Sequence, residues 1–415
     1  MKHRVAVIAG DGIGPEIIEA AIPILDRVAA RHDFALEWER LPFSADHYLK
    51  TKETLPATAL EHLRNDVDAI FLGALGDPRV PGNEHARDIL LGLRFKLDLY
   101  VNFRPVQLLH PDLTPLRNPG AIDFVIFREN TEGQYLGRGH SSGDEHVAEE
   151  VNTGRGVERI IRAAFDWATK HGKTRVTMSD KSNAIPTHRI WQERFKAIAK
   201  DYSGITPEHR YVDALALELV REPERFQVIV TNNLYGDILS DLGAGLVGGL
   251  GVAASANLHP GKRHALFEPV HGSAPGLVGK GVANPVAAVL TGGLMFEHLG
   301  HPAAAADLKQ AVRTLLATTA LAASERYTMT AFTNASQSNM SVYDSADGTR
   351  FTLRKPLAYA PPQGLIRDPS VMKHTVHVSR ESRAEPDVTV ATLLATDSTR
   401  SILARLTDQA RRAAS

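Results

Sequence analysis

Two carboxylates with a spacing that suits a metal ion follow a buried strand late in the chain. Asp237 and Asp241 lie four residues apart in a predicted helix that starts near Tyr235, after the apolar segment 227–230. Side chains four apart share one helix face, where two negative charges repel unless a cation lies between them. Oxygen ligands of this kind favour Mg²⁺ or Mn²⁺ over zinc. Open α/β sheets place ligands at such strand ends, although a solvated acidic face is the simpler alternative.

Three arginines near the ends of predicted elements have the chemistry to bind acids. Arg94, Arg104 and Arg128 lie among apolar neighbours, and a planar guanidinium binds a carboxylate through two hydrogen bonds. Each could instead be an ordinary surface or salt-bridging arginine. Tyr135 follows the third arginine, and a buried tyrosine beside arginines can donate a proton, the alternative being core packing.

A lysine and a further aspartate occupy comparable positions in the middle of the chain. Lys181 follows the predicted strand 175–178, and a lysine near carboxylates and a metal can act as a base. Asp213 opens the apolar helix 214–220, where it could also be a favourable N-terminal charge. Alternatively, Lys181 is an ordinary exposed lysine and Asp213 only a favourable charge at the start of a helix.

The elements that must position these residues alternate between strands and helices. Segment 5–9 is an apolar strand, a glycine turn follows, and apolar residues then recur at helical spacing from Ile17 to Val28. The turn invites a dinucleotide-binding Rossmann fingerprint, but the third glycine of that pattern would fall at Pro15, so we reject it. Further strands are predicted at 68–72 and 123–127. The sequence predicts an α/β protein that is not a Rossmann fold.

Composition limits the classes of function. The chain has 415 residues, 43% hydrophobic and 23% charged, which allows two or more domains with a sizeable core. A formal net charge of -1 gives no general attraction to nucleic acid or to anionic membranes. The absence of cysteine excludes disulfides and thiolate chemistry and suits a cytoplasmic protein. No apolar segment has the length of a membrane span or the pattern of a signal peptide.

Several longer motifs resemble those of the isocitrate/3-isopropylmalate dehydrogenase family. These are metal-dependent β-decarboxylating dehydrogenases, which include homoisocitrate and tartrate dehydrogenases. The motifs occur in the family's order from about residue 4 to about residue 300, and such a series is far more specific than any single motif. The matching segments are the two around Arg94 and Arg104, and residues 8–16, 128–133, 180–183, 230–241, 267–275 and 281–285.

The resemblance implies a role for each candidate side chain. The arginines would bind the carboxylates of a malate-type substrate, with Asn183 beside substrate and nicotinamide. Tyr135 and Lys181 would form an acid–base pair. The metal ligands would be Asp237 and Asp241, joined by Asp213 of a second subunit. The dinucleotide-binding residues would be His271, Gly272, Ser273, Ala274, Pro275, Gly276, Leu277 and Asn284.

The resemblance also implies a domain organisation. Residues 1–99 and 248–345 would form a discontinuous large domain that binds the dinucleotide. Residues 100–247 would form a smaller domain, from which the polar segment 137–156 would extend as a dimer arm. A homodimer with shared active sites is therefore expected. The last part, 346–415, has no counterpart in the family; 351–353 is a candidate strand, and 399–413 a basic amphipathic helix.

Two departures from the family motifs bear on specificity. NAD-dependent members carry an aspartate for the adenosine ribose, and NADP-dependent members a lysine and a tyrosine. Gly276 and Leu277 stand there instead, so NAD is favoured and NADP stays open. Arg87 occupies the place of a glutamate found in isopropylmalate users, whereas Leu90 and Leu91 match their leucines.

Arg87 thus predicts a malate with an acidic C3 substituent, as in isocitrate, homoisocitrate or a phosphonomethylmalate; a solvent-facing arginine is the alternative. Isopropylmalate, tartrate and malate are the other substrates left open. The family also contains non-catalytic regulatory subunits, but the tyrosine, lysine and aspartates that such a subunit would lack are all present.

Overall fold

The computed structural model describes residues 1–117, 119–318, 343–344 and 352–353. Its helices are α1 (Gly14–Arg31), α2 (Ala45–Thr51), α3 (Ala57–Asn65), α4 (Glu84–Lys96), α5 (Gly154–Lys170), α6 (Arg189–Ala199), α7 (Val212–Arg221), α8 (Asn233–Leu246), α9 (Val286–His298) and α10 (Pro302–Thr318). Its strands are β1 (Lys2–Gly10), β2 (Ala35–Leu41), β3 (Ala69–Ala74), β4 (Val101–Gln107), β5 (Asp123–Glu129), β6 (Gly139–Ser142), β7 (Glu145–Ala148), β8 (Arg175–Asp180), β9 (Thr206–Tyr211), β10 (Val228–Thr231), β11 (Ala254–Leu258), β12 (Leu266–Pro269), β13 (Tyr343–Asp344) and β14 (Thr352–Leu353).

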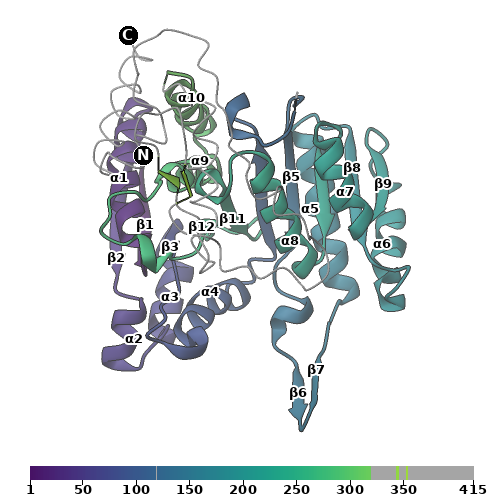
Figure 1. The fold of residues 1–415 in the computed structure, drawn as a ribbon, viewed down its shortest axis with the longest axis horizontal. Helices are drawn as coiled ribbons and strands as arrows, with labels where there is room; N and C mark the ends of the chain where they lie inside the picture. The colour runs from purple at the N-terminus through teal and green to yellow at the C-terminus, as the bar shows by residue number, and fades with distance from the viewer. Residues whose placement is uncertain (118, 319–342, 345–351, 354–415) are drawn as a thin grey trace.

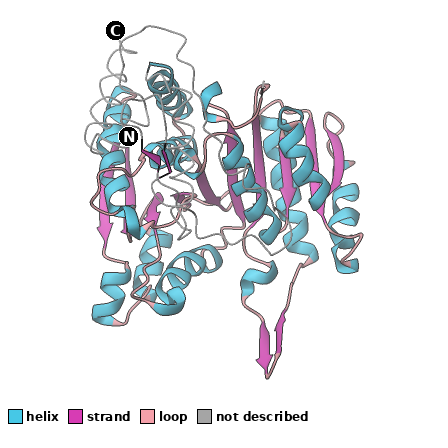
Figure 2. Ribbon diagram, in the orientation of Figure 1, coloured by secondary structure: helices cyan, strands magenta, loops and turns pink. Residues whose placement is uncertain are grey.

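One ten-stranded sheet runs through the described chain in the order β2-β1-β3-β12-β11-β4-β5-β10-β8-β9 (Figure 2). The outer strands pair in parallel, whereas β11 is antiparallel to both β12 and β4, and β4 is antiparallel to β5. The late strands β11 and β12 thus join the early strands β1–β3. This is the α/β fold with a discontinuous large domain that the sequence predicted. The exact domain boundaries remain a prediction.

Alternation along the strands assigns the helices to two faces of the sheet. In β5, Val125 and Phe127 pack in the cluster that contains α1, α5, α6, α9 and α10. Their neighbours Phe124 and Ile126 point the other way, into the cluster formed with α7 and α8. In β1, Ala6 and Ile8 likewise face α3 and α4. Helices α4 and α8 therefore lie on the same face of the sheet, α4 on its N-terminal half and α8 on the other half (Figure 1).

Local sequence explains where the two helices begin. The Asn232 side chain accepts a hydrogen bond of 2.9 Å from the Tyr235 amide and caps α8, so the helix starts at Asn233, two residues before the predicted start. The glycine loop after β1 contacts the loop after β12 through a 2.8 Å bond from the Ile13 amide to the Ser273 carbonyl. A Cβ at Gly12 would lie 1.9 Å from that carbonyl oxygen, so only glycine fits.

Two predicted peripheral features are present. Strands β6 and β7 form a hairpin that projects from the body of the molecule (Figure 1), as expected for the arm at 137–156. The candidate strand at 351–353 corresponds to β14, which pairs with β13. The predicted helix at 399–413 lies outside the described residues. Within the described part, every helix is too short or too polar to span a membrane.

Candidate active site

The three predicted arginines are buried and come together between α4 and α8. Arg94 Nη2 lies 2.7 Å from Glu268 Oε1, and Arg104 donates to Ser240 Oγ at 3.1 Å. Arg128 is 1% exposed, and two of its nitrogens donate to Asn233 Oδ1, at 3.0 and 2.7 Å. Burial lowers the pKa of Arg104 and lowers that of Arg128 to about 10, and the positive charge of Arg94 adds to both shifts. With a pKa of about 10, Arg128 stays protonated at neutral pH.

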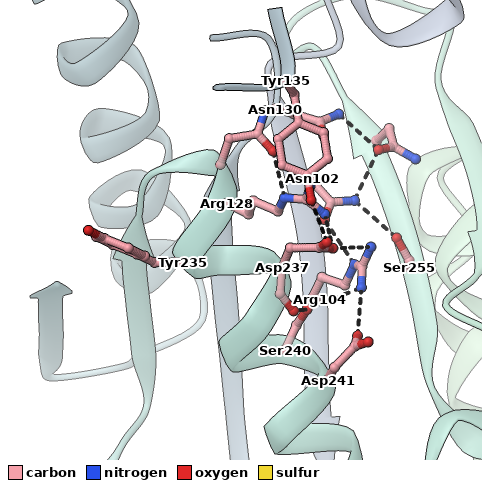
Figure 3. A network of polar contacts seen from close by, with 12 residues as sticks. Asn102, Arg104, Arg128, Asn130, Tyr135, Tyr235, Asp237, Ser240, Asp241 and Ser255 are labelled. Carbon is pink, nitrogen blue, oxygen red and sulfur yellow. Dashed lines mark hydrogen bonds and ion pairs between the residues drawn. The ribbon is translucent and has the colours of Figure 1, made fainter. Parts of the chain in front are cut away.

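The first turns of α8 place two carboxylates against these arginines (Figure 3). Asp237 Oδ1 lies 2.5 Å from Arg128 Nη1 and 3.7 Å from Arg104 Nη2. Asp241 Oδ1 lies 3.5 Å from Arg104 Nη1. Arg104 thus reaches from β4 to both carboxylates and supplies positive charge beside the pair from within the protein.

The environment shifts the pKa values of the two aspartates in opposite directions. Burial would raise the pKa of Asp237, but Arg128 and Arg104 outweigh it and lower the value. Burial raises the pKa of Asp241, and the more distant Arg104 offsets only part of that shift. Asp237 is therefore the more firmly ionised ligand of the pair.

Tyr135 completes the cluster from the short 3-10 segment Gly133–Leu136. Its hydroxyl donates to Asp237 Oδ2 at 2.7 Å, and its ring lies 5.1 Å from Arg128 Cζ. Burial raises the pKa of Tyr135, and the Asp237 carboxylate raises it further. The hydroxyl thus keeps its proton at neutral pH and is placed as a donor.

Lys181 and Asp213 form a separate pair at the ends of β8 and β9. Lys181 Nζ lies 2.6 Å from Asp213 Oδ1, and the two side chains are 24% and 66% exposed. No group of three or more acidic or histidine side chains suited to a metal occurs among the described residues. One chain therefore brings Asp237 and Asp241 together but does not add Asp213 to them.

Two predicted substrate-binding residues lie at the surface. Asn183 is exposed in the loop after β8. Arg87 is 64% exposed, and its nearest acidic partner is Asp88, at 3.6 Å. Helical spacing nevertheless places Arg87, Leu90, Leu91 and Arg94 on one face of α4, at positions i, i+3, i+4 and i+7. Along that face exposure falls from Arg87, through the half-buried leucines, to the buried Arg94.

The predicted cofactor residues form a loop after β12 that touches the glycine loop after β1. Ser273 is buried, whereas Gly272, Pro275 and Gly276 are exposed. His271 Nε2 is buried without a hydrogen-bond partner in the described structure, and burial lowers the pKa of this imidazole. The remaining members are Ala274, which has a positive φ of 39°, Leu277, and Asn284, whose side chain accepts from the Val286 amide.

Three polar residues of the cluster were not singled out from the sequence. Glu268 balances the charge of Arg94, Asn233 holds Arg128, and Ser240 holds Arg104. Glu268 lies inside the matched segment 267–275, and Asn233 and Ser240 lie inside 230–241. The motifs therefore contained the signal, but only the fold shows which arginine each residue contacts.

Comparisons with known proteins identify the class. The model of the isocitrate/isopropylmalate dehydrogenase family matches residues 4–336. The chain belongs to this family, and its α/β fold is the fold of the family.

Particular relatives are more informative. A 3-isopropylmalate dehydrogenase of Clavibacter michiganensis is 45% identical over 323 residues, covering 75% of this chain and 90% of that protein. A 3-isopropylmalate dehydrogenase of Thermobifida fusca is 43% identical over 318 residues, with 74% and 90% covered. The crystal structure of isocitrate dehydrogenase from Methylococcus capsulatus superposes with a TM-score of 0.69 at 39% identity, over 75% of this chain and 90% of that one.

Proposed function

We propose that this protein catalyses the NAD-dependent, Mg²⁺- or Mn²⁺-dependent oxidative decarboxylation of a 3-alkylmalate, with 3-isopropylmalate as the best candidate. The observation that carries the proposal is the cluster in which three buried arginines meet the more accessible Asp237, Asp241 and Tyr135. Such a cluster can hold two carboxylates and a hydroxyl in a fixed orientation.

The donor set at α8 fits a hard divalent cation. Asp237 and Asp241 offer carboxylate oxygens from successive helical turns, and these lie 3.7 and 3.5 Å from the Arg104 guanidinium. Asp213 of a second copy would supply a further ligand. A cation held by these carboxylates would supply positive charge that stabilises the negative charge developing during decarboxylation.

Two side chains would move protons. Lys181 of a second copy would accept the proton of the C2 hydroxyl as hydride leaves C2 for the nicotinamide. After carbon dioxide leaves C3, Tyr135 would donate its proton to that carbon. Its raised pKa suits this role, because the hydroxyl enters each cycle protonated.

The loop after β12 would hold the dinucleotide. Its exposed glycines leave the backbone open to a ligand, and the unpartnered Nε2 of His271 offers a polar contact. Gly276 and Leu277 provide no cation for a 2′-phosphate, which favours NAD over NADP.

The acidic C3 substituent predicted from Arg87 is not supported. Arg87 is largely exposed and lies beside Asp88, which already offsets its charge. The relatives reported above at 43% and 45% identity are named 3-isopropylmalate dehydrogenases. Leu90 and Leu91, which share the α4 face with Arg94, supply an apolar surface for an alkyl group.

A homodimer is part of the proposal. Large apolar side chains are exposed on α7 and α8, with Leu217 57%, Val220 42% and Ile238 59% accessible. A second copy that covers these helices would bury that surface and could bring Lys181 and Asp213 to the neighbouring cluster. A catalytic role is favoured over a regulatory one because the chain contains all of the proposed metal ligands and proton-transfer residues.

A substrate screen tests the function. NAD⁺ and NADP⁺ reduction is measured with Mg²⁺ or Mn²⁺ against 3-isopropylmalate, isocitrate, homoisocitrate, 3-phosphonomethylmalate, tartrate and malate. We expect 3-isopropylmalate with NAD⁺ to give the highest kcat/KM. Arg87→Leu should change that value by less than about threefold, since an exposed side chain contributes little. Preference for an acidic substrate that Arg87→Leu lowers by about tenfold or more would restore the acidic interpretation.

A further inference from the structure

We propose that Glu150 and His188 are positioning residues, which hold together the three segments that carry Tyr135, Lys181 and Asp237. The inference rests on the function proposed above. Neither residue belongs to the cluster of arginines and carboxylates. Both are nevertheless buried or nearly so, with side chains 17% and 1% exposed, and they contact each other through a 3.0 Å bond between Glu150 Oε2 and His188 Nε2.

The first connection leads to the proposed base. His188 lies at the end of the short 3-10 helix Pro186–His188, and its Nδ1 accepts a 3.3 Å hydrogen bond from the backbone amide of Lys181. An imidazole that accepts at Nδ1 carries its proton on Nε2, where Glu150 accepts it. Glu150 thus selects the tautomer in which His188 can hold the start of the Lys181 loop.

The second connection leads to the proposed metal ligands. Glu150 Oε1 accepts from Asn232 Nδ2 at 2.9 Å. This bond orients the amide of Asn232 so that its oxygen faces the Tyr235 amide, 2.9 Å away, and caps α8. The capped turn leads directly into Asp237. Glu150 therefore fixes the end of the helix from which both carboxylates project.

The third connection leads to the proposed proton donor. Val151, next to Glu150 in sequence, accepts a 2.8 Å backbone hydrogen bond from Gly133, the first residue of the segment that carries Tyr135. Asn152 Nδ2 donates to Glu150 Oε1 at 3.0 Å, and its oxygen accepts from the buried Trp191 at 3.2 Å. The carboxylate is thereby held from several sides.

The charge on Glu150 is maintained by these partners. Burial would raise the pKa of its carboxyl group, but the hydrogen bonds from His188, Asn152 and Asn232 outweigh burial and lower it. An ionised carboxylate accepts stronger hydrogen bonds than a neutral one, so the connections to Lys181 and to α8 support each other. Removing either partner should loosen both.

Two substitutions separate the connections. His188→Gln places a donor amide near Glu150 but removes the acceptor for the Lys181 amide. His188→Asn keeps an acceptor near the Lys181 amide but does not reach Glu150. The control is His62→Asn on α3, which breaks a histidine–glutamate bond of 2.9 Å to Glu39 far along the chain from the cluster.

We expect both His188 variants to lower kcat about 10- to 100-fold, because small misplacements of reacting groups have effects of that size. KM for the substrate should stay within about threefold, since the arginines are untouched. Melting temperatures are measured for all variants, and kcat is compared well below the lowest of them, so that lost activity does not reflect unfolding. Unchanged kcat, a loss confined to KM, or a loss of kcat that the control matches would overturn the proposal.

Amide hydrogen exchange provides a test that does not need turnover, and its wild-type measurement does not need a variant. In the wild-type dimer the amides of Lys181 and Tyr235 should exchange at least about tenfold more slowly than free peptide, and Glu150→Gln should accelerate both. Unprotected amides in the wild type would refute the geometry. If the wild type turns over no substrate but these amides behave as expected, the proposed function fails while the connection stands.

Discussion

Replacing Gly236 with alanine is the most discriminating single-atom test of the site. Gly236 lies in α8 directly against Arg128. A Cβ built there would stand 2.5 Å from Arg128 Cγ and 2.6 Å from its Cβ. Carbon atoms pack at about 3.5–4.0 Å, so the two elements must separate by roughly 1 Å. Arg128 is 1% exposed and cannot swing into solvent to avoid the contact.

The substitution acts differently on stability and on activity. Alanine favours the helix by about 1 kcal/mol over glycine, whereas overpacking a buried contact costs about 1–3 kcal/mol. The net loss of folding free energy should therefore lie between about 0 and 2 kcal/mol. Arg128 donates hydrogen bonds to Asn233 and Asp237, which lie on the same helix as Gly236. A shift of roughly 1 Å would move the Arg128 guanidinium away from these partners, so kcat/KM should fall about 100-fold.

The matched control is Gly92→Ala in α4. Its Cβ would meet only Leu55, at 4.0 Å, so the helix should gain up to about 1 kcal/mol while activity stays unchanged. The assay follows the absorbance of reduced nicotinamide with 3-isopropylmalate, and thermal unfolding of both variants accompanies it. If Gly236→Ala keeps kcat/KM within about threefold of wild type, the packing of Arg128 against α8 does not set the geometry of the site.

Three further outcomes are expected. Chelation should abolish turnover, and Asp241→Asn should raise the Mg²⁺ concentration needed for half-maximal rate at least about tenfold, which titration of the rate with metal measures. Burial raises the pKa of Glu129 to about 7, above its value in the unfolded chain. The contribution of this group to the folding free energy should therefore fall by at most about 3 kcal/mol as pH rises from about 4.5 to 7. Urea unfolding at the two pH values should show this loss in the wild type but not in Glu129→Gln. Ile238→Glu should be a monomer by light scattering and should have no dehydrogenase activity. An active monomer would contradict the proposal that two subunits share each site.

Local elements were predictable because their signals lie within a few residues. The continuous apolar run 124–127 predicted a buried strand, and its residues Val125 and Phe124 pack in the cores on opposite faces of β5. The spacing of Asp237 and Asp241 is the spacing of one helical turn. Helix α8 starts two residues before the predicted start near Tyr235, because the side chain of Asn232 caps it. Whether Asn232 or a later residue caps the helix depends on where the preceding strand ends.

The contacts between distant segments were beyond the reach of these local signals. The spacing of Asp237 and Asp241 on α8 does not show that Arg104, which lies on strand β4, contacts both of them. That contact follows from the position of β4 beside β5 and of α8 over both. Helical spacing placed Arg87 and Arg94 on the same face of α4. It could not show that side-chain exposure changes along two turns of that face, from the buried Arg94 to the exposed Arg87. The prediction that Arg87 binds an acidic C3 substituent is not supported for this reason, and its solvent-facing alternative agrees with the structure.

The balance of charge in the cluster supports an uncharged C3 substituent independently of the named relatives. Three arginines, Arg94, Arg104 and Arg128, stand against three carboxylates, Glu268, Asp237 and Asp241, so the cluster alone is close to neutral. A 3-alkylmalate carries two negative charges, and a divalent cation cancels them. A third carboxylate would leave an uncompensated negative charge beside the cluster, because Arg87 is largely exposed and already paired with Asp88. Substrate and metal should therefore bind cooperatively: calorimetric titration should show Mg²⁺ binding at least about tenfold more tightly with substrate present, and equal affinities would refute this account.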